Sequence, residues 1–406
     1  MEIDPQNGTA AIRAPAIGAH PSWSGSRTTP IARHYGLDWL RIGAFLLLIV
    51  YHIGLYLSPW DWHVNTATAV EDMPYILMAL NPWRMTLLFI VSGFAARAVL
   101  DRAESVGGFA VSRLKRLALP LLFGALLIVP PQPWVEVQDK LGYAHGYGHF
   151  LLYDYFGPRS ELTVTPGLFH LWFLSYILAY SLIVAAAAAI IPSSWTDRLQ
   201  RYFARLLGGW WIVVLPLAWL LVVREAIAPG LHPTNRLADD LPGHLIYLPA
   251  FLFGFGLARA RSLWEDIVRA WPAALMLALA GYGATIWQLH GYPGMPTLNG
   301  QMRAELGWAS LTGWGMILLL LAAAQCWLNR DHRWRAPLTE AVFPVYLVHQ
   351  TLIVLIGWWL RPYTIGTPAE TAILLAVTAA GCWAFYAAGS RIGWLRPWIG
   401  LGQARR

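Results

Sequence analysis

Charged residues are scarce in this chain. Asp, Glu, Lys and Arg make up 13% of its 406 residues, roughly half of the share that soluble globular domains carry. Hydrophobic residues make up 57%, and they gather in repeated apolar runs of roughly 20 residues, the length at which an α-helix crosses a bilayer core of about 30 Å. This composition excludes a soluble globular protein and predicts an integral membrane protein.

The apolar runs lack the alternation of apolar and polar residues that membrane-spanning strands require. The stretch SLIVAAAAAII at 181–191, for example, is apolar almost throughout. We therefore predict an all-α polytopic membrane protein with about ten transmembrane helices. The expected spans are 38–58, 74–98, 115–134, 167–191, 208–228, 243–261, 271–290, 306–328, 340–360 and 369–390.

Cysteine is almost absent, since the chain has only Cys326 and Cys382, and both fall inside expected spans. This position favours buried, unpaired side chains over a disulfide. No Cys/His spacing is typical of a metal site, and His145 and His149, in a loop rich in Gly and Tyr, are a poor candidate pair. We expect no metal site and no permanently bound cofactor.

The net charge is +7, but its placement argues against a nucleic-acid partner. If the N-terminus is cytoplasmic, most Lys and Arg residues fall in cytoplasmic links, whereas the acidic residues divide almost evenly. This asymmetry follows the positive-inside rule, so the basic excess predicts the topology, with both termini cytoplasmic. We expect a disordered cytoplasmic tail at 1–35, one membrane domain at 36–395 and a basic cytoplasmic tail at 396–406.

Arg41 and His52 lie eleven residues apart in the first expected span. On an α-helix this spacing puts both side chains on one face, about 16 Å apart along the axis. An ionisable residue inside a span is costly and suggests a function, and a neutral imidazole can accept a proton from a hydroxyl. The alternative is an interfacial arginine and a histidine that is satisfied by a neighbouring helix.

Three further arginines have two interpretations each. Arg113 and Arg116, just before the third apolar run, suit either ordinary cytoplasmic anchoring or a site for the phosphates of a donor, because guanidinium groups match phosphate oxygens. Arg84 lies several residues inside the second span, where an unpaired charge is costly, so we expect a pairing or substrate role. Ser92-Gly93 in the same span is expected to let helices approach closely.

Several aromatic and histidine side chains are expected near the outer ends of the spans. Trp62 and His63 follow the first span and could meet a sugar by stacking and hydrogen bonding. His170 and Trp172 begin the fourth span, and His349 lies roughly ten residues into the ninth. Each of these residues alone is equally explained by a polar loop turn or by a histidine that is satisfied within the helices.

Together these segments resemble the acyltransferase 3 family of membrane acyltransferases. The family's Arg-x10-His motif falls on Arg41 and His52, and its R-x-x-R motif falls on Arg113 and Arg116. WRMTLLFIVSGF, HLWFL and PVYLVHQ also look like segments of this family, and the resemblance runs from residue 36 to about 395. The layout is most similar to a branch that succinylates periplasmic glucans. No appended second domain is seen, so transfer within the membrane domain is expected.

The resemblance implies an O-acyltransferase of the bacterial inner membrane. It would move an acyl group, succinyl in preference to acetyl, from cytoplasmic acyl-CoA to hydroxyls of a periplasmic glucan or other envelope glycan. His52 would act as general base or transient acyl carrier with Arg41, while Arg113 and Arg116 would bind acyl-CoA. Acceptor or pathway residues would be Arg84, Trp62, His63, His170, Trp172 and His349. Expected partners are the bilayer, acyl-CoA, the glycan and other glucan-synthesis proteins.

Two other classes of function stay open. A transporter or flippase of a glycan or acyl precursor would use the intramembrane polar residues as a pathway, although no internal repeat with paired broken helices is evident. A structural scaffold in a glucan-synthesis complex would tolerate the loss of His52.

Overall fold

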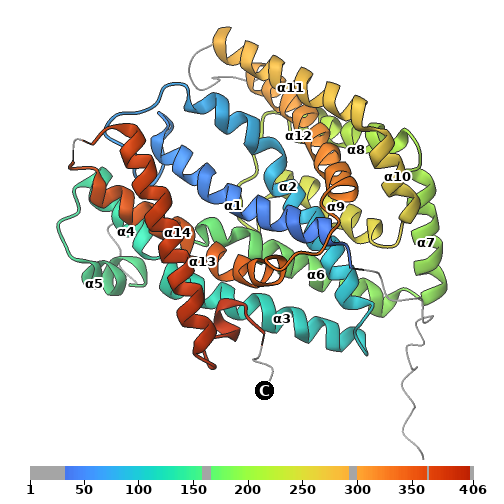
Figure 1. The fold of residues 1–406 in the computed structure, drawn as a ribbon, viewed down its shortest axis with the longest axis horizontal. Coiled ribbons are helices and arrows are strands. Elements are labelled where there is room, and N and C mark those ends of the chain that lie inside the picture. Colours follow the sequence, from blue (N-terminus) through green and yellow to red (C-terminus); the bar gives the residue numbers. More distant parts are fainter. Residues whose placement is uncertain (1–32, 158–165, 292–299, 364, 403–406) are drawn as a thin grey trace, which may run out of the picture.

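The computed structural model describes residues 33–157, 166–291, 300–363 and 365–402, and these residues form an all-helical bundle (Figure 1). Eight helical segments are long and apolar enough to span a membrane, or up to ten if each of two bent helix pairs is one span. The predicted fold class is confirmed. Residues 1–32 of the expected tail at 1–35 lie outside the described residues.

The helices follow the expected order of spans. Their bounds are α1 Tyr35–Leu57, α2 Met73–Leu100, α3 Val106–Phe123, η1 Gly124–Ile128, α4 Pro131–Leu141, α5 Tyr147–His149, η2 Phe150–Tyr155, η3 Phe169–Leu171, α6 Trp172–Ile190, α7 Ser193–Leu206, α8 Trp211–Val222, η4 Val223–Ile227, α9 Leu241–Leu257, α10 Arg261–Arg269, α11 Trp271–Gly291, α12 Gly300–Cys326, α13 Arg335–Leu360, α14 Thr367–Arg391 and η5 Pro397–Ile399.

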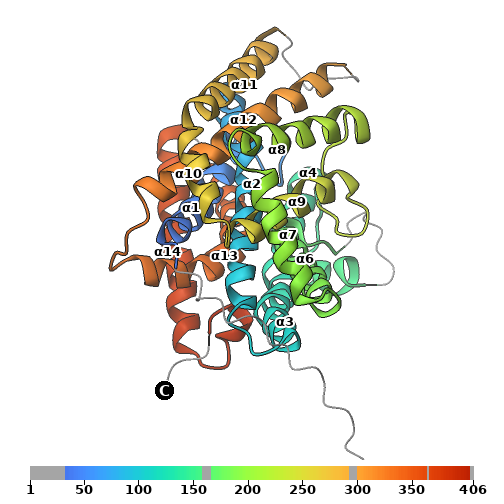
Figure 2. The same cartoon turned by 90° about the vertical axis from the view of Figure 1, so that its right-hand side faces the viewer.

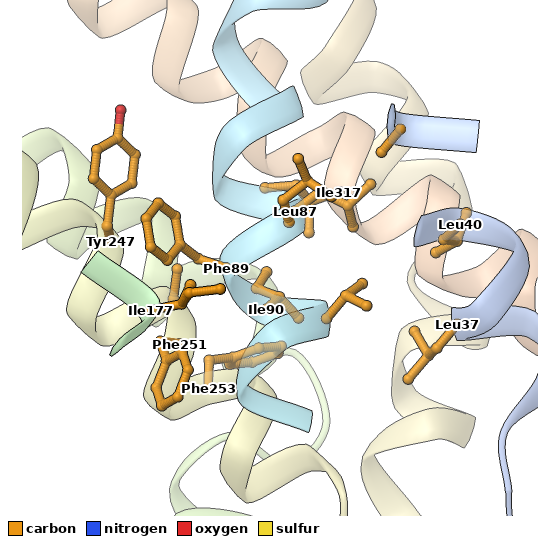
Figure 3. Packing of buried hydrophobic residues seen from close by; sticks show 14 of the residues in the cluster. Leu37, Leu40, Leu87, Phe89, Ile90, Ile177, Tyr247, Phe251, Phe253 and Ile317 are labelled. Atoms are coloured by element: carbon orange, nitrogen blue, oxygen red, sulfur yellow. The ribbon is translucent and has the colours of Figure 1, made fainter. Parts of the chain in front are cut away.

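Helix α2 runs through the middle of the bundle (Figure 2) and packs against α1, α9 and α12. Apolar side chains leave it in several directions: Leu87 and Ile90 belong to the same buried cluster as Leu40 of α1, and Phe89 stacks on Tyr247 of α9 (Figure 3). A helix that is apolar all round is typical of a buried position. This burial makes a charged side chain on α2 unusual.

The contact between α2 and α9 is close because glycine lies on both sides of it. A Cβ on Gly93 would run into the Phe251 carbonyl, and one on Gly254 would run into the Ile90 carbonyl. Without side chains at these positions the two backbones can touch, as small residues allow in membrane helix packing. The expectation for Ser92-Gly93 is confirmed at the glycine.

Two helix pairs bend sharply. The axes of α7 and α8 differ by 95°, and those of α9 and α10 by 113°. Trp195, Leu199, Tyr202 and Leu206 of α7 are exposed and recur at i, i+4, i+7 and i+11. This spacing gives one apolar stripe on a helix that also carries arginines, the pattern of a helix lying in the membrane interface.

The two ends of the bundle differ in character. The end at which α1 and α3 begin carries Arg41 and Arg113, and we call it the basic end. The opposite end, where α1 finishes at Leu57 and the chain passes through Trp62 and His63, is called the aromatic end; α4 and α5 lie on this side, away from α7 and α10 (Figure 1).

The chain after α14 folds back onto the bundle. Residues Pro397–Ile399 form η5, which packs against α3 and α13. Arg396 donates hydrogen bonds to the Ser390 carbonyl at 2.8 Å and to Glu340 at 3.1 Å. The described part of the expected tail at 396–406 is therefore ordered against the membrane helices as far as residue 402.

Candidate active site

The centre of the candidate site is a pair of histidines from helices that are distant in the sequence. His52 Nδ1 on α1 lies 3.2 Å from His349 Nε2 on α13. His349 Nδ1 lies 2.7 Å from the Tyr346 carbonyl oxygen, which can only accept, so Nδ1 carries the proton. With both rings neutral, His349 Nε2 accepts from His52 Nδ1–H, and His52 Nε2 is left as a lone-pair nitrogen.

His52 faces the helix bundle rather than lipid. The exposed residues in the same stretch of α1 are Gly43, Leu46 and Val50, which form one stripe along the helix. His52 comes two residues after Val50, about 200° round the helix, on the opposite side. The residue as a whole is partly exposed.

Arg41 lies on the same inner face of α1. The side chains between it and His52 on this face, Phe45 and Leu48, are buried, whereas Arg41 and His52 are both partly exposed. The expected placement of both residues on one face therefore agrees with the helix that forms. His52 lies five residues before the Leu57 terminus of α1, about 8 Å from the aromatic end of that helix.

The loop after α1 returns Trp62 over His52. The Asn65 amide donates to the carbonyls of Leu55, Ser58 and Trp60 at 2.9–3.2 Å, and it accepts from the Trp62 backbone N–H at 3.2 Å. An Asn side chain that satisfies loop carbonyls in this way fixes the turn. The Trp62 ring consequently stacks on His52, with 6.0 Å between centroids.

His63 in the same loop is held by a carboxylate. Its Nδ1 lies 2.7 Å from Glu136 on α4, and its Nε2 lies 3.2 Å from the Gln350 amide. The carboxylate fixes the proton on Nδ1, so Nε2 accepts from Gln350. Because both ring nitrogens have partners, His63 is suited to positioning a ligand at the aromatic end rather than to moving a proton.

His170 is likewise fixed by its neighbours. Its Nε2 donates to the Leu347 carbonyl at 3.0 Å, and its Nδ1 accepts from the Gln132 amide at 3.3 Å. Gln132 also donates to Thr351 at 2.7 Å and accepts from Gln350 at 2.9 Å. This chain of buried polar groups is mutually satisfied, which makes the arrangement rigid.

Arg84 reaches the same region from α2. Its guanidinium carbon lies 3.4 Å from the centroid of the Tyr51 ring, and Tyr51 is the neighbour of His52, with 5.8 Å between ring centroids. Arg84 is within electrostatic range of both His52 and His349. The structure therefore brings Arg84, Trp62, His63, His170 and His349 around His52. Trp172 lies in the aromatic packing beside Phe89 and Tyr247 instead.

Arg41, Arg113 and Arg116 form a group at the basic end, close enough to act on one another electrostatically. Arg113 is buried and donates from Nε to Ser181 Oγ at 3.3 Å, whereas Arg116 is exposed. Within the described part of the chain no carboxylate forms an ion pair with any of the three. Asp38 acts on Arg41 from beyond ion-pair distance, so three like charges gather here without an ion-paired carboxylate, an arrangement that suits an anionic ligand.

Other arginines at the basic end are paired. Asp101 bridges Arg97 at 3.0 Å and Arg259 at 2.7 Å, and Arg335 lies 2.9 Å from Asp38. These ion pairs connect helix ends, so the charges of Arg97, Arg259 and Arg335 are neutralised within the fold. Arg41, Arg113 and Arg116 differ from these three arginines, because no carboxylate of the described residues forms an ion pair with them.

Gln132, Gln350 and Thr351 complete the site, although they were not among the expected residues. The signal that could have identified Gln350 and Thr351 is the run His349-Gln350-Thr351 in an otherwise apolar span. Three successive polar side chains are expensive in a buried helix unless each finds a partner. Gln132, in PPQPW, had no comparable signal, since it reads as part of a Pro-rich turn.

Comparisons with known proteins agree with this arrangement. The family described as "Acyltransferase domain" (acyltransferase 3) matches residues 34–387. Proteins named glucans biosynthesis protein C from Escherichia coli strains SMS-3-5 and K12 are each 23% identical to this chain over 342 residues, which cover 82% of this chain and 86% of theirs. No solved structure matches. The chain is a multi-pass membrane enzyme that belongs to the acyltransferase 3 family.

Proposed function

We propose that this protein is an O-acyltransferase of the bacterial inner membrane. It moves an acyl group, succinyl in preference to acetyl, from cytoplasmic acyl-CoA to hydroxyls of a periplasmic glucan or other envelope glycan. The observation that carries the proposal is the position of His52: it lies on the same helix face as Arg41, between a basic end and an aromatic end, and its Nδ1 lies 3.2 Å from His349 Nε2.

The donor would bind at the basic end, which the proposal orients toward the cytoplasm. Arg41, Arg113 and Arg116 would hold the phosphates of CoA, because guanidinium groups pair with phosphate oxygens. The thiol-bearing arm of CoA would extend along the inner face of α1, over the distance of about 16 Å between Arg41 and His52. This position brings the thioester carbonyl to His52 while the charged part of CoA stays at the membrane surface.

The acceptor would arrive from the aromatic end, which the proposal orients toward the periplasm. Trp62 and His63 offer a stacking face and a hydrogen-bonding ring, both of which suit a sugar. The relatives named for glucan biosynthesis support a glucan as the acceptor. Because Trp62 stacks on His52, a sugar held there lies next to the catalytic imidazole.

His52 Nε2 would accept the proton from the sugar hydroxyl as its oxygen attacks the thioester carbonyl. The bond between carbonyl carbon and sulfur then breaks, and the proton passes from Nε2 to the sulfur, which leaves as the CoA thiol. In the alternative mechanism Nε2 attacks the thioester carbonyl and the C–S bond breaks to release CoA thiolate; the sugar hydroxyl then takes the acyl group from Nε2, and its proton goes to the thiolate. Both routes need the same nitrogen, and His349 keeps it unprotonated by fixing Nδ1–H.

The test is mass spectrometry of envelope glucans from cells that carry the wild type, His52→Ala or no gene. We expect the ester content of His52→Ala cells to be lower than that of wild-type cells by about 100-fold or more, at equal membrane levels of the two proteins, and cells without the gene to lack these esters. His145→Ala, in the exposed loop, serves as the control. Wild-type ester content in His52→Ala cells would refute a catalytic His52, and unchanged ester content in cells without the gene would refute the acyltransferase function.

A further inference from the structure

Arg84 is a buried cation without a described counter-anion. Only 5% of its surface is exposed, and its Nε and Nη1 atoms find no hydrogen-bond partner within the described residues. No carboxylate of those residues forms an ion pair with it; the Tyr51 ring face is its main contact. A cation–π contact offsets only part of the cost of burying a charge. An anion is therefore expected beside Arg84 when the protein works.

This cation lies at the level of the catalytic histidine. His52 is 17 residues from Tyr35, and Arg84 is 16 residues from Leu100, where these two antiparallel helices meet the basic end. Both side chains are thus about 25 Å from that end. Tyr51 connects them, since its ring contacts Arg84 and neighbours His52. Any anion that Arg84 binds lies close to the reacting carbonyl.

The reactants of the proposed function offer few candidates for this anion. A glucan is uncharged, and the phosphates of CoA would be held at Arg41, Arg113 and Arg116, about 16 Å away along α1. Two negative charges can arise near His52. One is a free carboxylate at the far end of the acyl group, and the other is the transient oxyanion of the tetrahedral intermediate. The oxyanion exists only briefly, so it leaves Arg84 unpaired in the loaded ground state.

We propose that Arg84 binds the free carboxylate of a dicarboxylic acyl group and so selects the donor, an inference that rests on the proposed function. The thioester carbonyl lies at His52 while the distal carboxylate pairs with the guanidinium, a match of geometry as well as charge. A neutral acyl group of the same length would leave Arg84 buried and unpaired. A site built for a polar group strongly rejects the analogue that lacks it.

A second buried arginine provides a matched control. Arg224 on η4 also has Nε and Nη1 atoms without hydrogen-bond partners among the described residues. It acts on Tyr247, whose hydroxyl points away from the surrounding apolar side chains (Figure 3), and it is not among the charges that act on His52. Arg84 also acts on Tyr247, so removing Arg224 eliminates a similar buried charge nearby that does not act on His52.

The experiment compares succinyl-CoA with butyryl-CoA. The butyryl group also has four carbons but carries no charge. The full-length wild type, Arg84→Met, Arg84→Lys and Arg224→Met are reconstituted in vesicles, and ester formation on the glucan and CoA release are measured. We expect Arg84→Met to lower kcat/KM for succinyl-CoA by about 100-fold and to leave butyryl transfer within about threefold. For Arg84→Lys, kcat/KM for succinyl-CoA should lie between the values for the wild type and Arg84→Met. Arg224→Met should keep the wild-type ratio of kcat/KM for succinyl-CoA to kcat/KM for butyryl-CoA.

Calorimetry with non-reactive thioether analogues of the two donors compares their binding affinities without turnover. This measurement also serves if butyryl transfer is too slow to detect. Parallel losses for both donors in Arg84→Met would assign Arg84 to a common step and overturn the inference, as would unchanged succinyl transfer. A wild type that transfers no acyl group from any acyl-CoA would instead refute the proposed function itself.

Discussion

His52 Nδ1 and His349 Nε2 lie 3.2 Å apart although 297 residues separate them in the chain. The Tyr346 carbonyl holds the proton of His349 on Nδ1, and this one backbone contact sets the tautomers of both rings. The reactive nitrogen of His52 is therefore determined by α13. When His52 takes up a proton in the reaction, its Nδ1–H donates to His349 more strongly, because the bond becomes charge-assisted.

His349→Leu should lower kcat because this charge-assisted bond is lost. Hydrogen bonds to charged groups contribute about 1.5–3 kcal/mol, so we expect a decrease of roughly 10- to 100-fold at saturating donor and acceptor. His349→Gln, which can still offer an acceptor to His52, should recover part of the rate. Initial rates with purified protein in vesicles provide the measurement, and a wild-type kcat for His349→Leu would contradict this role.

Arg113→Ala should weaken donor binding. Loss of one guanidinium–phosphate contact of about 1.5–3 kcal/mol should raise KM for acyl-CoA roughly 10- to 100-fold and change kcat little.

The control for Arg113 is Arg259→Ala, at the same end of the bundle. Asp101 already pairs with Arg259 at 2.7 Å, so its removal should affect stability and leave KM for acyl-CoA near the wild-type value. Equal increases of KM in both variants would show that general charge at the basic end, and not a specific site, attracts the donor.

Asn65→Ala should affect the acceptor and spare the donor. The Asn65 amide bonds three carbonyls and orders the turn that places Trp62 on His52. We expect KM for the glucan to rise several-fold while KM for acyl-CoA stays unchanged. Thr68→Ala, at an exposed position in the same loop, serves as the control. A donor KM that rises in parallel would contradict a role confined to the aromatic end.

His34 should make the fold sensitive to acid. Burial lowers the pKa of His34 from its ordinary value of 6.5, and the ring caps α1 by accepting from Leu37 N–H at 3.2 Å. The pKa of His34 is lower in the folded protein than in the unfolded chain. Below about pH 6.5 the unfolded chain therefore binds a proton that the folded protein does not, and the free energy of unfolding decreases as the pH is lowered.

His34→Asn should reduce this sensitivity. Asn keeps the capping interaction and does not titrate, so the midpoint of thermal unfolding should drop less between pH 7 and pH 5 than in the wild type. Differential scanning in detergent gives the comparison. Identical pH profiles for the two proteins would exclude His34 as a contributor.

The sequence predicted the fold class well because each span carries its signal locally. The apolar runs need no partner to be recognised, and the ten expected spans coincide with helical segments of the bundle. The boundaries were less accurate where helix capping decides them. The third expected span began at residue 115, whereas α3 begins at Val106, because the Ser105 side chain accepts from Gly108 N–H and starts the helix earlier.

Part of the candidate site could be predicted from the sequence, and the other part is visible only in the tertiary structure. The face shared by Arg41 and His52 follows from their spacing on one helix, since helical geometry is fixed by the backbone. Which nitrogen of His52 is free, and which arginines lack partners, depends on contacts between helices far apart in the chain. Gln132, Gln350 and Tyr346 have roles only because α13 meets α4, η3 and α1.

The sequence alone determined that this protein crosses a membrane many times and carries a histidine and an arginine on one buried helix face. These properties depend on local hydrophobicity and helix periodicity. The tertiary structure decided that no carboxylate of the described residues pairs with Arg84, while Arg97 and Arg335 are paired. Pairing depends on distances of a few ångströms between side chains from different helices, and only the packing of the whole bundle sets those distances.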